Sequence, residues 1–250
     1  MKRSLEILQV LQYDAHIRIA AMTNQQFKAG RVQARLSQVN AAQRLRLSQP
    51  YLSQLERGQR PITAELARFA TKVYGLPPTG LPVPETTISD EVSNASRVAR
   101  QLSGLGYPNF AHIRAEKINP AALVLQVLIQ RDLEVRMTEA LPWVLGTYPD
   151  LGWSWLMDQV KLKDVQNRLG FLIGLTKELA VTRGKLHSAL EPLSAVEVKL
   201  EHSRLAREDT LCRESMPPAE RRWLAINRSP LARHWNLLTG LTVDQLSYAS

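Results

Sequence analysis

Residues 36–61 read LSQVNAAQRLRLSQPYLSQLERGQRP, and this stretch decides the fold of the N-terminal part of the chain. Its pattern predicts a short helix, a tight turn and a second short helix that ends at Glu-Arg-Gly. Ser37 and Ser48 each precede a helix, and a serine hydroxyl there accepts a hydrogen bond from a free amide of the first turn. Pro50 suits the first turn of the second helix, because its missing amide would have no partner there. Gly58 follows the last turn, where a left-handed cap needs no side chain.

The apolar side chains of this stretch repeat at a spacing that lets two short helices pack against each other. Those expected to face inward are Leu36, Ala41, Ala42 and Leu45 of the first helix and Leu52 and Leu55 of the second. The residues therefore predict a helix pair with a shared apolar core.

Positive charge is concentrated around the same stretch. The chain of 250 residues carries a net charge of +9. Residues 28–75 hold nine basic and two acidic side chains, a net charge of +7, whereas residues 1–27 and 76–250 carry +1 each. A basic segment of this kind attracts the phosphates of a nucleic acid. A solvated basic face without a partner is the alternative, and the helix pair favours the nucleic acid.

These residues resemble the Cro and phage-repressor family of helix-turn-helix proteins, the XRE type. The resemblance covers about residues 27–77. It rests on Leu36-Ser37-Gln38, Ser48-Gln49, Tyr51-Leu52-Ser53-Gln54-Leu55-Glu56-Arg57-Gly58, Pro61, Leu66-Ala67, Phe69-Ala70 and Gly75-Leu76-Pro77. The resemblance implies a five-helix lambda-repressor-like DNA-binding domain. Its second helix of the pair, the recognition helix, would enter the major groove of double-stranded DNA.

The resemblance also implies which side chains contact a DNA operator. The full set is Gln38, Arg46, Ser48, Gln49, Pro50, Tyr51, Ser53, Gln54, Arg57, Gln59 and Arg60. Gln49 would pair bidentately with adenine, and Gln38 would contact a phosphate at the start of the first helix. The arginines that follow the recognition helix would touch backbone phosphates. Arg31 and Glu56 would form a partly buried structural ion pair.

One position departs from the family pattern. The turn between the two helices usually holds glycine, and here it holds Arg46. If this turn needs a left-handed backbone, an arginine costs about 1–2 kcal/mol there. A contact between Arg46 and a phosphate would offset part of that cost.

Four segments follow from the composition along the chain. Residues 1–24 have a helical pattern and are an N-terminal helix or a start-site extension, since Met22 can also initiate. Residues 25–77 form the DNA-binding domain, and the proline-rich residues 78–92 are typical of an extended linker. Residues 93–250 show helical periodicity and no strand pattern. We therefore expect an all-α chain with a separate C-terminal multi-helix domain.

The apolar pattern of the C-terminal region predicts particular helices. One helix carries Leu162, Val165, Leu169, Leu172 and Leu179 and ends near Gly184. An earlier helix carries Leu123, Val127, Leu133 and Met137 and ends at Pro142. Asp150 is expected to cap a later helix. All five tryptophans lie in this region. They form either a helical core or a binding surface, because tryptophan is favoured at interface hot spots.

Several other classes of protein find no support in the sequence. No apolar run reaches the roughly 18 residues of a membrane span. Cys212 is the single cysteine, which excludes an internal disulfide and fits a reducing compartment. The five histidines show no metal-ligand spacing, and there is no glycine-rich phosphate loop. We therefore expect a cytoplasmic protein that is not an enzyme and binds no metal, cofactor or membrane.

The predicted function is that of a sequence-specific transcriptional regulator, in the simplest form a repressor. One recognition helix reads few base pairs, so we expect a homodimer on two half-sites of a double-stranded DNA operator. Two roles stay open for residues 93–250. They would bind a cognate toxin, which makes the chain an antitoxin that represses its own toxin-antitoxin operon. Alternatively, they would sense a metabolite and join two copies of the chain.

Overall fold

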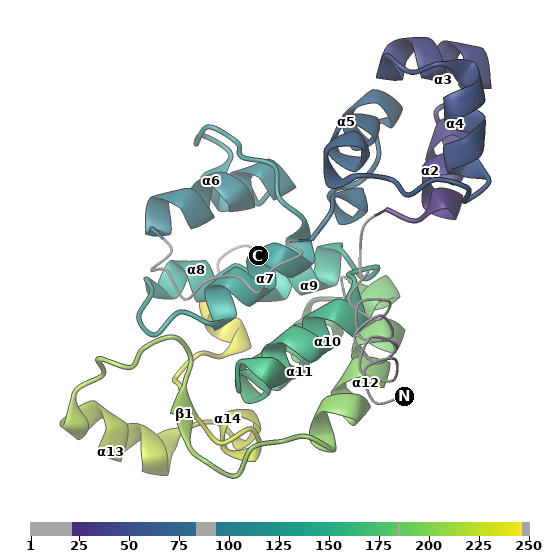
Figure 1. Ribbon diagram of the computed structural model, residues 1–250. Coiled ribbons are helices and arrows are strands. Elements are labelled where there is room, and N and C mark those ends of the chain that lie inside the picture. Colours follow the sequence, from purple (N-terminus) through teal and green to yellow (C-terminus); the bar gives the residue numbers. More distant parts are fainter. Residues whose placement is uncertain (1–21, 84–93, 185, 247–250) are drawn as a thin grey trace, which may run out of the picture. The chain divides into compact units, whose positions relative to one another are not determined.

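The computed structural model describes residues 22–83, 94–184 and 186–246 (Figure 1). The helix predicted within residues 1–24 therefore lies almost wholly outside the described residues.

Helices make up nearly all of the regular structure, which confirms the predicted all-α class. Among the described residues, the sheet consists of one parallel pair of two-residue strands, β1 (Asp209–Thr210) and β2 (Leu237–Leu238). The chain divides into two compact units, Met1–Thr87 and Ile88–Ser250.

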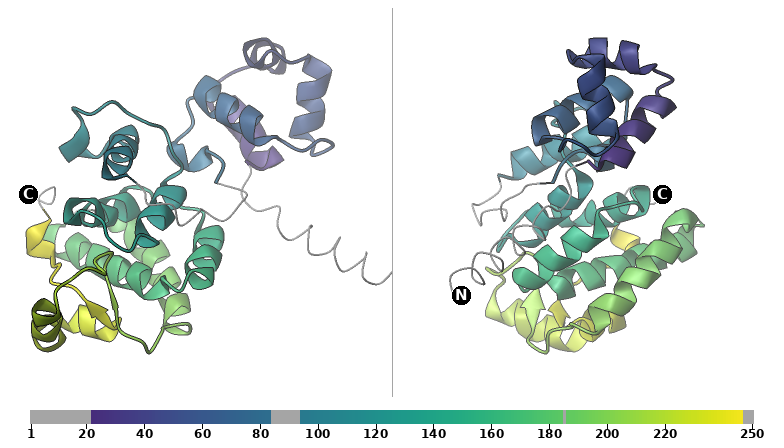
Figure 2. Two further views of the ribbon diagram at one scale, coloured as in Figure 1. Left: turned by 60° about the vertical axis from the view of Figure 1, so that its left-hand side comes forward. Right: turned by 45° about the vertical axis from the view of Figure 1, so that its right-hand side comes forward.

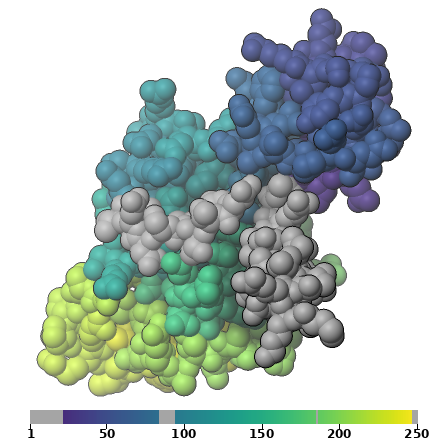
Figure 3. Space-filling view, in the orientation of Figure 1, coloured from purple at the N-terminus to yellow at the C-terminus, as the bar shows by residue number. Residues whose placement is uncertain are grey.

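Four α-helices and one 3-10 helix form the described part of the N-terminal unit. They are α2 (Asn24–Gln33), α3 (Gln38–Leu45), α4 (Gln49–Glu56), α5 (Ala64–Tyr74) and η1 (Pro78–Gly80). Phe27, Leu52 and Leu55 are fully buried at its centre. Phe27 meets Tyr74 edge to face, with ring centroids 5.5 Å apart. The space-filling view shows these helices closely packed, in purple to blue (Figure 3).

The N-terminal unit continues into the segment that its proline content assigned to a linker. Residues 78–80 form η1, and the hydroxyl of Thr71 in α5 donates to the carbonyl oxygen of Gly80 at 3.3 Å. Val83 is buried. Prolines set the backbone for a 3-10 turn as readily as for an extended chain, which explains why composition alone does not separate the two.

Helices also build the C-terminal unit, together with two 3-10 helices. The described elements are α6 (Ala95–Leu105), η2 (Pro108–Phe110), α7 (Pro120–Leu128), α8 (Val135–Glu139), α9 (Leu141–Thr147), α10 (Trp153–Leu162), α11 (Gln166–Arg183), α12 (His187–Glu201), α13 (Pro218–Asn227), α14 (Pro230–His234) and η3 (Val243–Gln245). The long helix α11 packs against α9, α10, α12 and α14 and is the core element (Figures 1 and 2).

Two glycines let neighbouring side chains approach the backbone of α11 closely. A Cβ atom at Gly170 would lie 2.4 Å from the ring of Trp235, and one at Gly174 would lie 2.6 Å from the side chain of Leu231. Trp235 is fully buried. The absence of side chains at these two positions therefore allows α14 and the residue after it to seat on α11.

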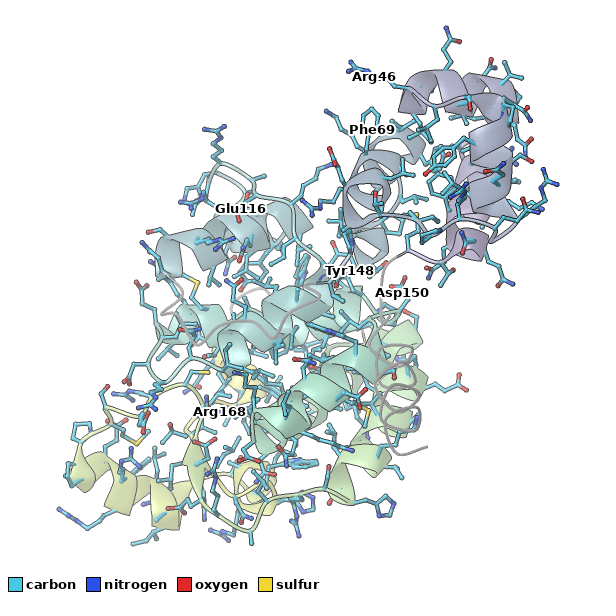
Figure 4. The ribbon with its side chains drawn as sticks, in the orientation of Figure 1. Arg46, Phe69, Glu116, Tyr148, Asp150 and Arg168 are labelled. Atoms are coloured by element: carbon cyan, nitrogen blue, oxygen red, sulfur yellow. The ribbon has the colours of Figure 1, made fainter. Side chains whose placement is uncertain are left out.

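Arg168 joins α11 to the segment that contains β1 (Figure 4). Its guanidinium donates to both carboxylate oxygens of Asp209, at 2.7 and 2.9 Å, and to the carbonyl oxygens of Leu128 and Gln130, at 2.7 and 2.8 Å. The sulfur of Cys212 lies 3.7 Å from the same guanidinium and is fully buried. Burial raises the pKa of the Cys212 thiol to about 11.

The helix predicted from Leu162 to Leu179 is in fact two helices. α10 ends at Leu162, Asp164 takes a positive φ of 55°, and α11 begins at Gln166. The left-handed residue ends the helical hydrogen-bond pattern, and it leaves Leu162 67% exposed instead of in the core. The predicted end near Gly184 is confirmed, because this glycine caps α11 in the left-handed conformation.

Pro142 and Asp150 have roles other than those predicted. Pro142 does not end a helix but lies in the first turn of α9, where its missing amide is tolerated. The predicted earlier helix is in fact two: Leu123 and Val127 lie in α7, Met137 lies in α8, and Leu133 lies between them. Asp150 does not cap α10, because the N-cap residue is Gly152 and no side chain caps that helix.

Candidate nucleic-acid interface

The helix pair α3 and α4 begins as the sequence predicts. The hydroxyl of Ser37 accepts from the amide of Asn40 at 3.1 Å, and that of Ser48 accepts from the amide of Tyr51 at 3.4 Å. Pro50 lies in the first turn of α4. Each serine satisfies an amide that would have no partner within its helix.

The turn between α3 and α4 is left-handed at Arg46. Its φ and ψ are 58° and 39°, and the next amide, that of Leu47, donates to the carbonyl oxygen of Ala42 at 2.9 Å. This is the conformation that glycine adopts without strain. The side chain of Arg46 is exposed, and Figure 4 shows it directed away from the domain. The departure at this position therefore keeps the backbone geometry and adds a cation beside the helix pair.

A chain of polar contacts runs from α2 to the recognition helix α4. Arg31 donates to both carboxylate oxygens of Glu56, at 2.5 and 3.1 Å. The same carboxylate accepts from Nε2 of Gln38 at 2.8 Å. Oε1 of Gln38 in turn accepts from Nε2 of Gln49 at 2.8 Å. The predicted ion pair is thus present, and it is linked through Gln38 to the side chain expected to read a base.

This chain of contacts holds the side chain of Gln49 in place and leaves some of its hydrogen-bonding groups free. The amide group of a glutamine has two donor hydrogens and one acceptor oxygen. Gln49 uses one donor toward Gln38, so its oxygen and its second donor remain for a base edge. These are the two groups that a bidentate contact with adenine needs. The side-chain amide of Gln38, by contrast, already donates to Glu56 and accepts from Gln49, so only its second amide hydrogen remains for a phosphate.

The other residues predicted to contact DNA lie on α4 and around its two ends. Those that are exposed are Arg46, Ser48, Gln49, Pro50, Tyr51, Arg57, Gln59 and Arg60. Gln54 and Ser53 are partly buried. Arg57 folds back along the helix, and its Nη2 donates to the hydroxyl of Ser53 at 2.8 Å. This contact leaves the hydroxyl donor of Ser53 and further guanidinium donors of Arg57 free for DNA.

Asn24 supports the interface through two hydrogen bonds across the domain. Its Nδ2 donates to the carbonyl oxygen of Leu55 at 2.6 Å and to that of Arg60 at 3.0 Å. These bonds tie the start of α2 to the end of α4 and to the loop that carries Gln59 and Arg60. No local pattern signals such a role, because the partners are more than thirty residues away in sequence.

Glu56 and Arg31, the two charged residues of this chain of contacts, have shifted pKa values. Burial alone would raise the pKa of the Glu56 carboxyl, but hydrogen bonds from Arg31 and Gln38 outweigh it and lower that pKa. The hydrogen bond to Glu56 raises the pKa of Arg31. Both groups are therefore charged at neutral pH, and the ion pair is a fixed part of the helix pair.

A family model described as a helix-turn-helix domain matches residues 25–82. Residues 25–82 thus form a helix-turn-helix domain, the fold of a DNA-binding transcription regulator. The domain is of the XRE/Cro-like type, as the sequence predicts. Comparison of the chain with curated proteins and with solved structures found no match.

Two further findings concern the described residues only. Their histidine, cysteine, aspartate and glutamate side chains form no cluster that could hold a metal ion. Among the same residues, every helix is too short or too polar to cross a membrane.

Proposed function

We propose that the chain is a sequence-specific repressor that binds a DNA operator as a homodimer. The observation that carries the proposal is the exposed first turn of α4, where Gln49 is held by Gln38 and keeps one donor and one acceptor for a base. The net charge of +7 on residues 28–75 supplies attraction to phosphates. Such a protein needs no cofactor and acts where chromosomal DNA lies, in the cytoplasm.

Selection of binding sites from random duplexes tests this proposal. The full chain should enrich one sequence, and footprinting should protect two half-sites about 10 base pairs apart, centre to centre. A scrambled duplex of the same composition serves as the control. Binding that never distinguishes the enriched duplex from the scrambled one would contradict sequence-specific recognition. A reporter gene placed behind the enriched site then separates repression from activation.

We further propose that the chain is an antitoxin whose C-terminal unit binds a toxin. Val181 of α11 and Val198 of α12 support this role, because they are 73% and 60% exposed on two helices that pack together. Exposed apolar side chains on neighbouring helices are suited to a protein partner. An ion pair between Lys177 and Glu197, at 2.5 Å, joins the same two helices.

Co-purification of the full chain from its native cell tests the antitoxin role. A co-purified protein should be lethal when it is expressed alone and harmless when this chain is expressed with it. Val181→Glu and Val198→Glu should abolish the rescue and leave DNA binding unchanged, whereas Glu191→Gln, an exposed position of α12, should leave both unchanged. A partner that is not toxic, or rescue that survives both valine substitutions, argues against this role.

A further inference from the structure

Helix α13 exposes an apolar face that no described part of the chain covers. Trp223 and Ile226 are 60% and 74% exposed, and Leu224 is the only residue of this helix that is buried. Trp223 and Ile226 are three residues apart and so share one side of the helix, with Arg222 one turn before Ile226. Figure 1 shows α13 at the edge of the C-terminal unit. Two large apolar side chains on one face are suited to contact with a protein surface.

A groove lies directly beside this face. Its volume is about 420 Å³, and Trp223 forms part of its wall. The apolar wall continues with Met216, Leu224, Leu238 and Leu241. Its dimensions suit the entry of a large side chain, since ligand pockets in proteins start at about 300 Å³.

The charges beside the groove and on α13 are complementary. Glu139 lines the groove and is partly buried, and it has no hydrogen bond or ion pair with any residue that the structure describes. Arg222 on α13 is exposed and equally without a partner within the described ranges. The other carboxylate of the groove, Glu220, is already paired with Arg213 at 2.5 Å. An unpaired carboxylate in a recess thus stands near an unpaired guanidinium on the adjacent outer face.

A symmetric contact requires one patch to supply both a protruding group and its recess. Helix α13 and its groove meet this requirement, because Trp223 and Arg222 protrude next to an apolar groove that holds Glu139. We propose that this face joins two copies of the chain, with Trp223 of each copy in the groove of the other and Arg222 of each copy paired with Glu139 of the other. This inference rests on the proposed function, in which two half-sites call for two copies.

Charge reversal on the full chain tests the contact, with sedimentation velocity as the readout. The wild-type chain should sediment as a dimer. Arg222→Glu and Glu139→Arg should each raise the dimer dissociation constant at least about tenfold, because each places like charges together. The double variant Arg222→Glu/Glu139→Arg should restore the dimer, and Trp223→Glu should abolish it. Arg183→Glu, at an exposed cation of α11, is the matched control and should have no effect.

Two outcomes overturn the proposal. One is a wild-type chain that stays monomeric at the highest soluble concentration, which would leave the α13 face for another protein. The other is a dimer that survives the single reversals or is not restored by the double variant. Thermal melting monitored by circular dichroism shows whether each variant is folded. Operator binding measured on the same samples keeps the two proposals apart. A monomer that still binds one half-site contradicts the dimer contact but not DNA recognition. A dimer that binds no DNA contradicts the regulator function but not the dimer contact.

Discussion

Arg31 and Glu56 are 25 residues apart in sequence, yet their side chains share two hydrogen bonds between α2 and the end of α4. Their side chains are only 11% and 2% exposed, so water screens the pair poorly. Because the same carboxylate holds Gln38, which holds Gln49, the ion pair positions the recognition helix and the side chain expected to read DNA.

Glu56→Gln should therefore destabilise the N-terminal unit strongly. The substitution leaves the buried guanidinium of Arg31 without its counter-charge, and breaking a buried pair in this way costs about 3–5 kcal/mol. Calorimetric unfolding of the full chain at neutral pH measures the loss. Glu65→Gln, at an exposed position of α5, is the control and should cost less than about 1 kcal/mol.

The same pair gives this prediction a pH signature. The pKa of Glu56 is lower in the folded chain than in the unfolded one, so its stabilisation is complete above the unfolded value of about 4.3 and disappears as the pH falls through the lower folded value. The difference between wild type and Glu56→Gln should shrink over that acidic range. A difference that stays constant down to the acid transition would show that the charge of Glu56 does not stabilise the fold.

Base-reading and phosphate-binding residues should respond differently to alanine substitution. Gln49→Ala and Gln54→Ala should reduce discrimination between operator and scrambled DNA, by about 1–3 kcal/mol for each lost bidentate pair. Arg57→Ala and Arg60→Ala should weaken all sequences alike and reduce the salt dependence of binding by about one unit of slope each. Competition binding at several ionic strengths separates the two classes. Equal losses of discrimination for all four variants would defeat this assignment of roles.

Arg46→Gly should stabilise the helix pair and weaken its hold on DNA. Glycine adopts the left-handed turn without strain, so the free energy of unfolding should rise by about 1 kcal/mol. The lost cation should weaken binding to every duplex. Arg46→Ala is the matched control, because it removes the charge and keeps the strain. If the two variants have the same stability, a side chain at position 46 causes no strain in the left-handed turn.

The helix-turn-helix was predictable from sequence because its signals are local. The cap serines, Pro50, Gly58 and the spacing of Leu52 and Leu55 each act within one or two turns of a helix, and the structure places them as expected. The hydrogen bond between Gln38 and Gln49 has no such local signal, because it depends on how the two helices cross.

The C-terminal helices were harder to place because tertiary packing decides where they end. Asp164 interrupts an apolar pattern that reads as continuous, since the residue following a helix can turn the chain without changing the spacing of leucines. Pro142 begins a helix rather than ending one. The exposure of Trp223 and the burial of Trp235 also depend on neighbours distant in sequence, so composition alone left both core and surface open for the tryptophans.

Gly170→Ala should destabilise the C-terminal unit although alanine is the better helix former. The gain in helix propensity is about 1 kcal/mol, but the new methyl group would lie 2.4 Å from the ring of Trp235. Forcing an extra carbon into a packed core costs about 1–3 kcal/mol, so the net change should be a loss. Urea unfolding followed by tryptophan fluorescence reports on this unit alone, since all five tryptophans lie in it. Gly152→Ala, where nothing lies within 4 Å, is the control. An unchanged midpoint for Gly170→Ala would mean that the Trp235 ring shifts freely.

The buried thiol of Cys212 is a built-in probe of local opening in the C-terminal unit. It is the single cysteine of the chain, and burial raises its pKa to about 11, which disfavours the reactive thiolate until the surroundings of Arg168 open to water. The rate at which an alkylating reagent labels the native chain therefore measures how often that region opens. Labelling rates measured with and without a DNA duplex show whether DNA binding at the N-terminal unit changes the opening of the C-terminal unit. The measurement needs no attached dye and no substitution.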